Sequence, residues 1–236
     1  MGTERLKPIE AANCFINKRF PDCQGAILAG SVVRGQATET SDLDIVVFDD
    51  SVTTSYRESL IDLGWPIELF VHSLTSYQYI FQIDYLDGVP TMQRMIAEGL
   101  ILKDKGMMES IKEEAKSILE LGPEKWTDEI PNRRYFITDV LDDFIGSNNR
   151  AEDLFIANRL ADQLQEFILR ANGRWVGRSK WVIRSLRLYD EKLTEDFVEA
   201  FDLFYKTGEK SKIIELTDNV LEPYGGRLFE GFSIGR

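Results

Sequence analysis

The chain has 236 residues, 43% of them hydrophobic and 29% charged, a composition typical of a globular protein that can bury a core. Its formal net charge of −12 repels phosphate backbones, so a nucleic-acid substrate is disfavoured and a cationic partner is weakly favoured. No apolar run approaches the roughly 18 residues of a membrane span, so no membrane partner is expected. Two cysteines and one histidine exclude a disulfide framework and disfavour a zinc site. These cysteines and a charged N-terminus that lacks an apolar signal region favour the cytoplasm.

The first half mixes short apolar runs with amphipathic segments. The expected helices are 8–20, 53–64, 73–86, 90–99 and 107–122, and the expected strands are 25–30, 43–48, 65–72 and 100–104. In the first helix we expect Ile9, Cys14, Phe15 and Ile16 to face the core. Segment 53–64 is predicted to be a helix because a threonine opens it and a glycine closes it.

The second half is predicted to be helical throughout. The expected helices are 132–146, 149–172, 178–190, 194–207 and 210–223. The boundary falls near "LGPEKWTDEIP", which gives an N-terminal domain of residues 1–122 and a C-terminal helical domain of residues 123–236. The predicted fold class is therefore α+β, a mixed sheet with flanking helices followed by a helical bundle.

Two aspartates open the second predicted strand, in "SDLDIVVF". Residues i and i+2 of a strand share a face, so Asp42 and Asp44 point the same way while Leu43 and Ile45 point into the core. Neighbouring carboxylates repel each other, and a divalent cation between them removes the repulsion. Mg²⁺ suits this donor set, because it binds one or two protein carboxylates together with substrate phosphates.

Two other features extend this site. Glu68 lies in the apolar run "PIELFV", which could run beside the first strand and add a third carboxylate, as a metal ligand or as a base. Gly30 and Ser31 end the run "GAILAG" and offer backbone N–H groups and a hydroxyl where a triphosphate could bind.

The stretch "LAGSVVRGQATETSDLDIVVF" resembles the signature of the polymerase-beta-like nucleotidyltransferase superfamily. That signature has Gly-Ser after an apolar strand, a loop of about ten residues, Asp-x-Asp at the next strand, and a third acid on a later strand. Gly30, Ser31, Asp42, Asp44 and Glu68 fall on those positions, and Arg34, Gly35 and Ser41 match residues that accompany the motif. The resemblance implies transfer of a nucleoside monophosphate from an NTP to an acceptor, with Mg²⁺ and with release of pyrophosphate.

The acceptor is indicated only by architecture. A nucleotidyltransferase domain followed by a helical bundle resembles the antibiotic nucleotidyltransferases, including the kanamycin and lincosamide enzymes. This implies ATP as co-substrate, an aminoglycoside or lincosamide as acceptor, and a pocket that such enzymes often build across a homodimer. Alternatives are a protein-modifying enzyme of the toxin–antitoxin type and an inactive nucleotide-binding module; an RNA-tailing enzyme fits the acidic charge least.

The helical half offers two further groups of candidates. Lys180, Arg184 and Arg187 form one stripe, and Lys180 and Arg184 are candidates for binding the NTP phosphates, the alternative being ion pairs with neighbouring helices. Asp139, Asp142 and Asp143 could act as a general base or hold a cationic acceptor, but they are also explained as the solvated side of a helix whose core face is Phe136, Val140, Leu141 and Phe144.

Overall fold

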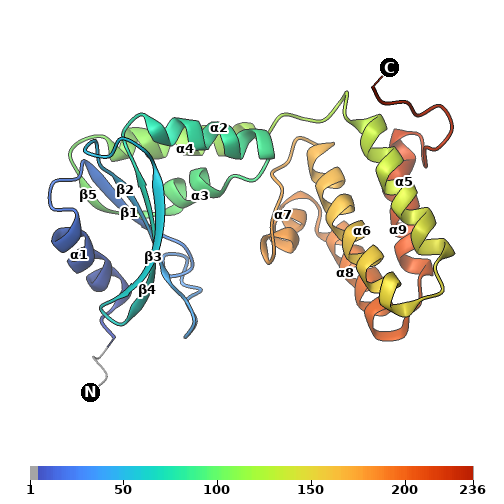
Figure 1. Ribbon diagram of the computed structural model, residues 1–236, viewed down its shortest axis with the longest axis horizontal. Coiled ribbons are helices and arrows are strands. Elements are labelled where there is room, and N and C mark those ends of the chain that lie inside the picture. The colour runs from blue at the N-terminus through green and yellow to red at the C-terminus, as the bar shows by residue number, and fades with distance from the viewer. Residues whose placement is uncertain (1–4, 236) are drawn as a thin grey trace. The chain divides into compact units, whose positions relative to one another are not determined.

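The computed structural model describes residues 5–235 and divides into two compact units, Met1–Leu121 and Gly122–Arg236. The first unit holds a five-stranded sheet with helices on both faces, and the second is built from helices (Figure 1). The predicted α+β class is confirmed.

One mixed sheet organises the first unit. Its strands are β1 (Gly25–Ala29), β2 (Leu43–Phe48), β3 (Tyr56–Asp62), β4 (Trp65–His72) and β5 (Leu100–Asp104). They lie in the order β3-β4-β2-β1-β5; β2 and β4 are parallel, and every other neighbouring pair is antiparallel. The segments 25–30, 43–48, 65–72 and 100–104 were predicted as strands, and all four predictions are confirmed.

The two faces of the sheet are covered by different helices. Helix α1 (Pro8–Arg19) packs on the face that carries Leu43, Ile45 and the alternate residues of β4. Helices α2 (Ser76–Asp87), α3 (Thr91–Glu98) and α4 (Met108–Leu121) pack on the opposite face, which carries Val46 and Phe48. Figure 1 shows α1 on one side of the strands and α2 to α4 on the other. Because both faces are packed, β1 and β2 read as continuous apolar runs.

Helix α1 is rotated from its predicted orientation. Phe15 and Ile16 are buried as expected, but Ile9 and Cys14 are exposed, so that part of the prediction is wrong. Ala11 and Ala12 lie against the sheet instead of them. Their small side chains let the helix backbone approach the strands closely, and this turns Ile9 and Cys14 toward solvent.

Segment 53–64 is not the predicted helix: residues Tyr56–Asp62 form β3, an edge strand paired antiparallel with β4. Its side chains alternate between exposed and half-buried, which is the period of a strand. Gly64 does not end a helix. With Leu63 it makes a two-residue hairpin turn in which both residues have positive φ, 53° and 77°.

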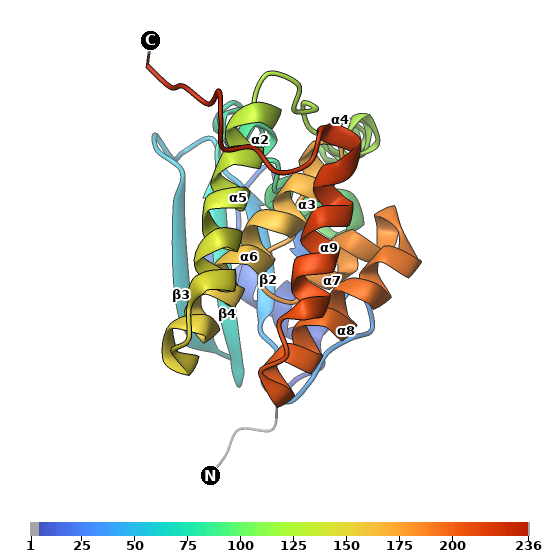
Figure 2. The same ribbon diagram turned by 90° about the vertical axis from the view of Figure 1, so that its right-hand side faces the viewer.

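The second unit contains the helices α5 (Ile130–Gly146), α6 (Arg150–Arg170), α7 (Trp181–Tyr189), α8 (Glu191–Thr207) and α9 (Ser211–Leu221), followed by a short 3₁₀ turn (Glu222–Tyr224). Helix α6 contacts α5, α7, α8 and α9, and Figure 2 shows α5 and α9 alongside each other with α6 between and behind them. Buried apolar residues of α5, α6, α8 and α9 form its interior. The predicted helical second half is confirmed.

A buried ion pair joins three helices of this second unit. Lys210 lies just before α9, and its Nζ donates to the Asp153 carboxylate at 2.7 Å and to the backbone oxygens of Phe144 and Ser147 at 2.7 and 2.8 Å. These partners belong to α6 and to the end of α5. The ammonium is therefore fully hydrogen-bonded, which compensates its burial.

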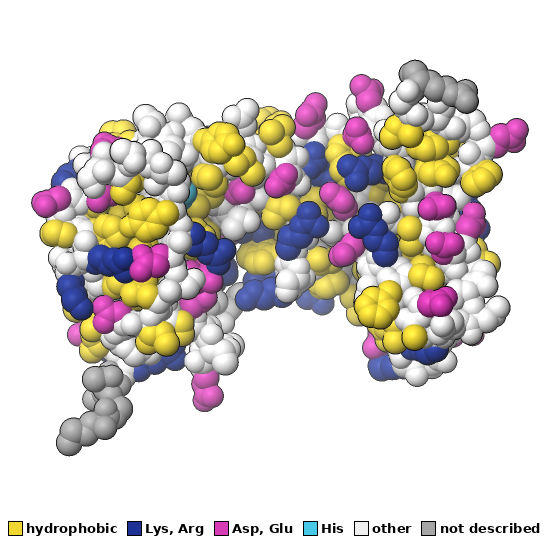
Figure 3. All heavy atoms as spheres, viewed as in Figure 1, with side chains coloured by type: hydrophobic (Ala, Val, Ile, Leu, Met, Phe, Trp, Pro, Cys, Tyr) yellow, Lys and Arg dark blue, Asp and Glu magenta, His cyan; other side chains and the backbone are white. Residues whose placement is uncertain are grey.

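The surface mixes both signs of charge. On the face drawn in Figure 3, Lys and Arg side chains lie among Asp and Glu side chains and apolar ones. Of the helices in residues 5–235, none combines the length and the apolar character needed to traverse a bilayer.

The hairpin turn gives a test of the corrected β3 assignment. Gly64→Ala places a side chain at a φ of 77°, and we expect the free energy of unfolding to fall by about 1–2 kcal/mol. Denaturant titration of the full chain measures the change. The matched control is Gly146→Ala at the end of α5, where an added Cβ meets open space and φ is not left-handed; we expect it to be neutral or stabilising. Equal losses in both variants would contradict the turn geometry.

Candidate active site

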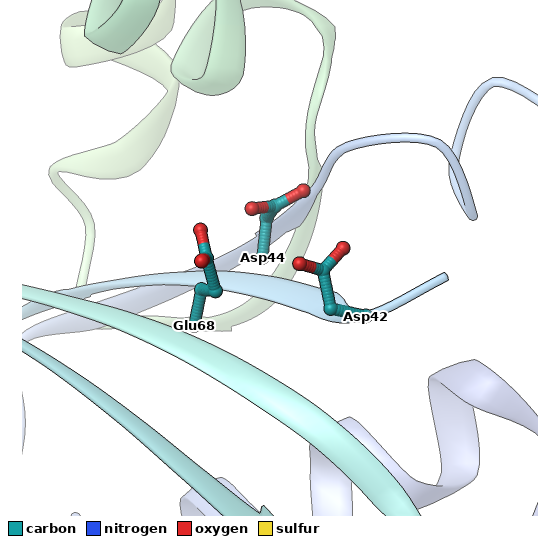
Figure 4. Close-up of side chains that lie close together, drawn as sticks. All are labelled: Asp42, Asp44 and Glu68. Atoms are coloured by element: carbon teal, nitrogen blue, oxygen red, sulfur yellow. The ribbon is translucent and has the colours of Figure 1, made fainter. Parts of the chain in front are cut away.

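Strand register brings the three predicted carboxylates together. Ala29 of β1 lies opposite Asp44 of β2, and Asp44 lies opposite Glu68 of β4. Asp42 precedes β2 and shares the face of Asp44. One carboxylate oxygen from each of Asp42, Asp44 and Glu68 lies within 4.8 Å of the others, and all three residues are half-buried. Figure 4 shows the three side chains rising from the same side of the sheet toward one another.

Burial and electrostatic repulsion together disfavour the charged form of Asp44 in this cluster. Burial, followed by the charges of Asp42 and Glu68, raises the pKa of Asp44 from 3.8 to about 6, while Arg34 and Arg57 lower it. The chain thus holds a carboxylate in a place where its charged form is disfavoured. A divalent cation bound among these oxygens would reverse that penalty, so the donor set fits Mg²⁺.

The Gly-Ser segment lies directly beside the cluster. Gly30 follows β1 with a φ of 79°, and a Cβ added to it would collide with the Asp44 carboxylate. Only glycine therefore allows this chain path against Asp44. The backbone oxygens of Gly30 and Ser31 accept bonds from Arg34 N at 3.4 Å and Gln36 N at 2.9 Å, which form a tight turn after the strand.

The loop between β1 and β2 is braced by hydrogen bonds. Ser31 Oγ donates to Ser41 Oγ at 3.1 Å, and Ser41 Oγ also accepts the backbone N–H of Thr38 at 2.8 Å. The Arg5 guanidinium donates to the backbone oxygens of Ser41 at 2.9 Å and Glu39 at 3.2 Å. Ser41 is thus a buried structural brace, and any phosphate contact it makes stays a prediction.

Two arginines flank the cluster from opposite sides. Arg34 pairs with Glu98 of α3 at 3.1 Å. Arg57 of β3 donates to Glu68 at 2.6 Å, and its guanidinium lies 4.9 Å from the centre of the Phe70 ring. The sequence motif includes Arg34 but misses Arg57, because 53–64 was predicted to be a helix. A strand prediction for that segment would have made Arg57 a candidate.

The cationic candidates of the helical half belong to the second unit. Lys180 is exposed at the residue before α7, and Arg184 lies on α7 with its guanidinium 4.9 Å from the Trp181 ring centre. Their assignment to the NTP phosphates stays a prediction.

The acidic candidates lie on α5. Asp139, Asp142 and Asp143 are all exposed, and Asp142 pairs with Arg227 at 3.6 Å. Leu141 and Phe144 form the buried face as predicted, but Phe136 is 43% exposed and Val140 only half-buried; Ile137 and Thr138 are buried in their place. Asp142 and Asp143 border a hollow of about 680 Å³ between α5 and α6. Their role as a base or an acceptor site stays a prediction.

Comparison with known proteins identifies the first unit. Residues 11–118 match the family model described as nucleotidyltransferase domain, and this range includes the whole sheet and all three acids. The first unit therefore matches a nucleotidyltransferase domain, in agreement with the resemblance of its sequence signature to the polymerase-beta-like superfamily. This match supports transfer of a nucleoside monophosphate as the class of reaction, and it implies an NTP as substrate.

Other comparisons are less informative. A nucleotidyltransferase-like protein from Exiguobacterium sibiricum has a solved structure that aligns over 91% of this chain and 74% of its own, with 12% sequence identity and a TM-score of 0.48. A comparison with curated protein sequences gives no match. The assignment therefore rests on the family match to the first unit.

The raised pKa of Asp44 predicts a pH-dependent stability. Its folded pKa of about 6 exceeds the ordinary 3.8, so this carboxyl stabilises the fold below pH 4, and the contribution is lost as the pH rises through 6. In metal-free protein at pH 7, Asp44→Asn should therefore raise the free energy of unfolding by about 2 kcal/mol, and at pH 4 it should change it little.

Denaturant titrations with a chelator present, at both pH values, measure this difference. Asp22→Asn, at an exposed aspartate of the same unit, is the control, and we expect it to change the free energy by less than about 0.5 kcal/mol at either pH. An Asp44→Asn variant that is less stable than the wild type at pH 7 would show that the carboxylate is favourably held without a cation.

Proposed function

We propose that the protein transfers AMP from ATP to a hydroxyl of a small molecule, with Mg²⁺ and with release of pyrophosphate. The observation that carries this proposal is the meeting of Asp42, Asp44 and Glu68 within 4.8 Å, beside a glycine whose backbone lies against Asp44. A structural explanation for three half-buried carboxylates on neighbouring strands would need compensating bonds, and only Glu68 has an ion-pair partner among the described residues of the cluster, Arg57.

In this reaction Asp42, Asp44 and Glu68 would hold the metal. Bound Mg²⁺ supplies positive charge to the phosphate oxygens and so favours attack at phosphorus. The acceptor hydroxyl gives its proton to a base, its oxygen forms a bond to the α-phosphorus, and the bond from that phosphorus to the β-phosphate oxygen breaks. The products are the AMP ester, pyrophosphate and one proton.

The base is one of four carboxylates. Glu68 is the candidate within the cluster, and Asp139, Asp142 and Asp143 are the candidates of the second unit. Loss of Glu68 would remove both a metal ligand and a base, whereas loss of one α5 aspartate would lower the rate without changing metal affinity. This difference separates the candidates.

The remaining predicted residues would bind the nucleotide. Gly30 and Ser31 present backbone N–H groups and a hydroxyl to the triphosphate, and Arg34 and Ser41 support the same loop. Lys180 and Arg184 would add positive charge for the leaving pyrophosphate. We assign residues 1–122 to catalysis and residues 123–236 to binding of the acceptor.

An aminoglycoside or a lincosamide antibiotic is the acceptor class we propose, on the resemblance of architecture. The formal net charge of −12 supports the aminoglycosides, which are polycations. A homodimeric assembly and a cytoplasmic location belong to the same proposal.

The test is pyrophosphate release by the purified chain with Mg²⁺ and each NTP, against aminoglycosides, lincosamides and candidate protein acceptors. We expect acceptor-dependent release with ATP, and we expect Asp42→Asn/Asp44→Asn to reduce it about a thousandfold, since several kcal/mol of transition-state stabilisation are lost. Asp196→Asn/Asp202→Asn, which removes two carboxylates of α8, makes the same change of charge and should retain the rate.

Two other results of these measurements would contradict the proposal in different ways. Release that depends only on a protein acceptor would replace the small-molecule proposal with a protein-modifying enzyme. Failure of the wild-type chain to bind any NTP with Mg²⁺ in calorimetry would overturn the active-site assignment.

A further inference from the structure

A second polar site lies on the same sheet face as the acidic cluster, still within the first unit. Strand β4 places Glu68, Phe70 and His72 on one face, two residues apart. Phe70 and His72 border a pocket of about 380 Å³, which we call the His72 pocket. Its other walls include Ser55, Arg57, Asp84 and Met92. The volume lies in the range of small-molecule sites.

His72 carries a buried nitrogen without a partner. The residue is 4% exposed, and its Nε2 has no hydrogen-bond partner among the described residues. Buried polar atoms of this kind are rare and call for an explanation. A ligand in the pocket would provide the missing partner.

The hydrogen bonds on the other side of the ring define what Nε2 can bind. His72 Nδ1 lies 3.0 Å from Ser55 Oγ, and Ser55 Oγ donates to Ser76 Oγ at 2.8 Å. A serine hydroxyl has one hydrogen, so Ser55 must accept from Nδ1–H. Burial lowers the pKa of His72 to about 4, so the neutral ring has no second proton at pH 7. Nε2 is therefore a hydrogen-bond acceptor.

Asp84 adds a second acceptor. Its Oδ2 accepts the backbone N–H of Met92 at 2.7 Å, which fixes the carboxylate in the wall of the pocket. Burial raises the pKa of Asp84 to about 6, although hydrogen bonds from the backbone N–H groups of Met92 and Thr91 lower it. The carboxyl group of Asp84 is therefore mostly charged at pH 7. For Nε2 and for this carboxylate alike, a hydroxyl or an ammonium group is the complementary ligand chemistry.

The order of the strands gives the pocket its place in the reaction. Gly30 and Ser31 follow β1, the acids lie on β2 and β4, and the His72 pocket lies over β4 and β3. If the triphosphate binds at Gly30 and Ser31, pyrophosphate leaves on the β1 side. The attacking oxygen of an in-line displacement comes from the opposite side, which is the side of β4 and β3.

We propose that the His72 pocket anchors one end of the acceptor and selects acceptors rich in hydroxyl and amino groups. The role as an acceptor site rests on the proposed function, whereas the binding of hydrogen-bond donors does not. Arg57 links the two sites, because it pairs with Glu68 and also borders the pocket. Glu68 and His72 are four positions apart along β4, about 13 Å, so an acceptor that reaches both is elongated.

His72 is the only histidine of the chain, which makes it a direct reporter. Protein labelled with ¹⁵N in histidine gives one pair of imidazole nitrogen signals, and the free protein should show a protonated Nδ1 and an unprotonated Nε2. Three probes are titrated without nucleotide: glucosamine, glucose and gluconate. We expect the Nε2 signal to move with glucosamine and with glucose, glucosamine binding about tenfold more tightly because its ammonium pairs with Asp84, and we expect no movement with gluconate.

Two variants test the named residues. Asp84→Asn should remove the preference for glucosamine over glucose while the His72 signal still responds, and Asp22→Asn, at an exposed aspartate of the same unit outside the pocket, should retain the preference. His72→Asn keeps a donor toward Ser55 and removes Nε2, so calorimetry should show about tenfold weaker binding of both sugars. If that variant does not fold, Asp84→Asn alone decides.

Further outcomes separate this proposal from the proposed function. Protonation of Nε2 in the free protein, or a signal that no probe moves, would overturn the pocket. A signal that moves with Mg²⁺ and a non-hydrolysable ATP analogue, and not with the sugars, would assign the pocket to the nucleoside and overturn its role for the acceptor. If the sugars bind and no NTP does, the donor site stands while its role as an acceptor site fails together with the proposed function.

Discussion

The burial of Asp44 beside the charges of Asp42 and Glu68 is the constraint on which the site of the first unit depends. Parallel pairing of β2 with β4 places Asp44 directly opposite Glu68, and the antiparallel partner β1 ends beside Asp44. Gly30 lies where a side chain would collide with the Asp44 carboxylate. Arg34 and Arg57 lie on either side and lower the pKa of Asp44. The fold keeps a local cost that a bound cation would reduce, which is the expected signature of a site rather than of a stabilising cluster.

How far the sequence predicts this site depends on how local the signals are. Gly30, Ser31, Asp42 and Asp44 lie within fifteen residues, so turn chemistry and strand period were enough to place them together. Glu68 required the pairing of β4 with β2, which the sequence allowed but did not specify. The C-terminal helices were predictable because their apolar periodicity is long, although the buried face of α5 was partly wrong, since Phe136 is exposed and Thr138 is buried.

The failure to predict strand β3 at residues 53–64 has two physical causes and several consequences. A turn made by Leu63 and Gly64 is an uncommon hairpin signal, because a leucine with positive φ is strained and Asn-Gly or Asp-Gly is the usual choice. The alternation of hydrophobicity along this edge strand is also weak, since its side chains are exposed or only half-buried. Without β3, neither the Arg57–Glu68 ion pair nor the wall of the His72 pocket could be anticipated. Ser55, Tyr56 and Arg57 are the pocket residues that lie in the missed segment, whereas His72 and Asp84 lie on a predicted strand and a predicted helix.

The face of the sheet beneath α2 to α4 changes from charged to apolar side chains along its strands. This change decides which part of the face the helices leave uncovered. Along β2 it runs from Asp44 through Val46 to the fully buried Phe48, and along β4 it runs from Glu68 through Phe70 to His72. The helices cover the apolar end, where Tyr77 and Phe81 pack edge-on in a chain of rings that begins at Phe48. They leave the charged end uncovered.

The position of these helices is limited from both sides. A helix shifted toward Asp44 would bury three carboxylates at a cost of several kcal/mol each, whereas a shift the other way would expose Phe48. The same hydrophobic packing that fixes these helices therefore fixes the edge of the site, and it encloses His72, which lies opposite Phe48 at the apolar end.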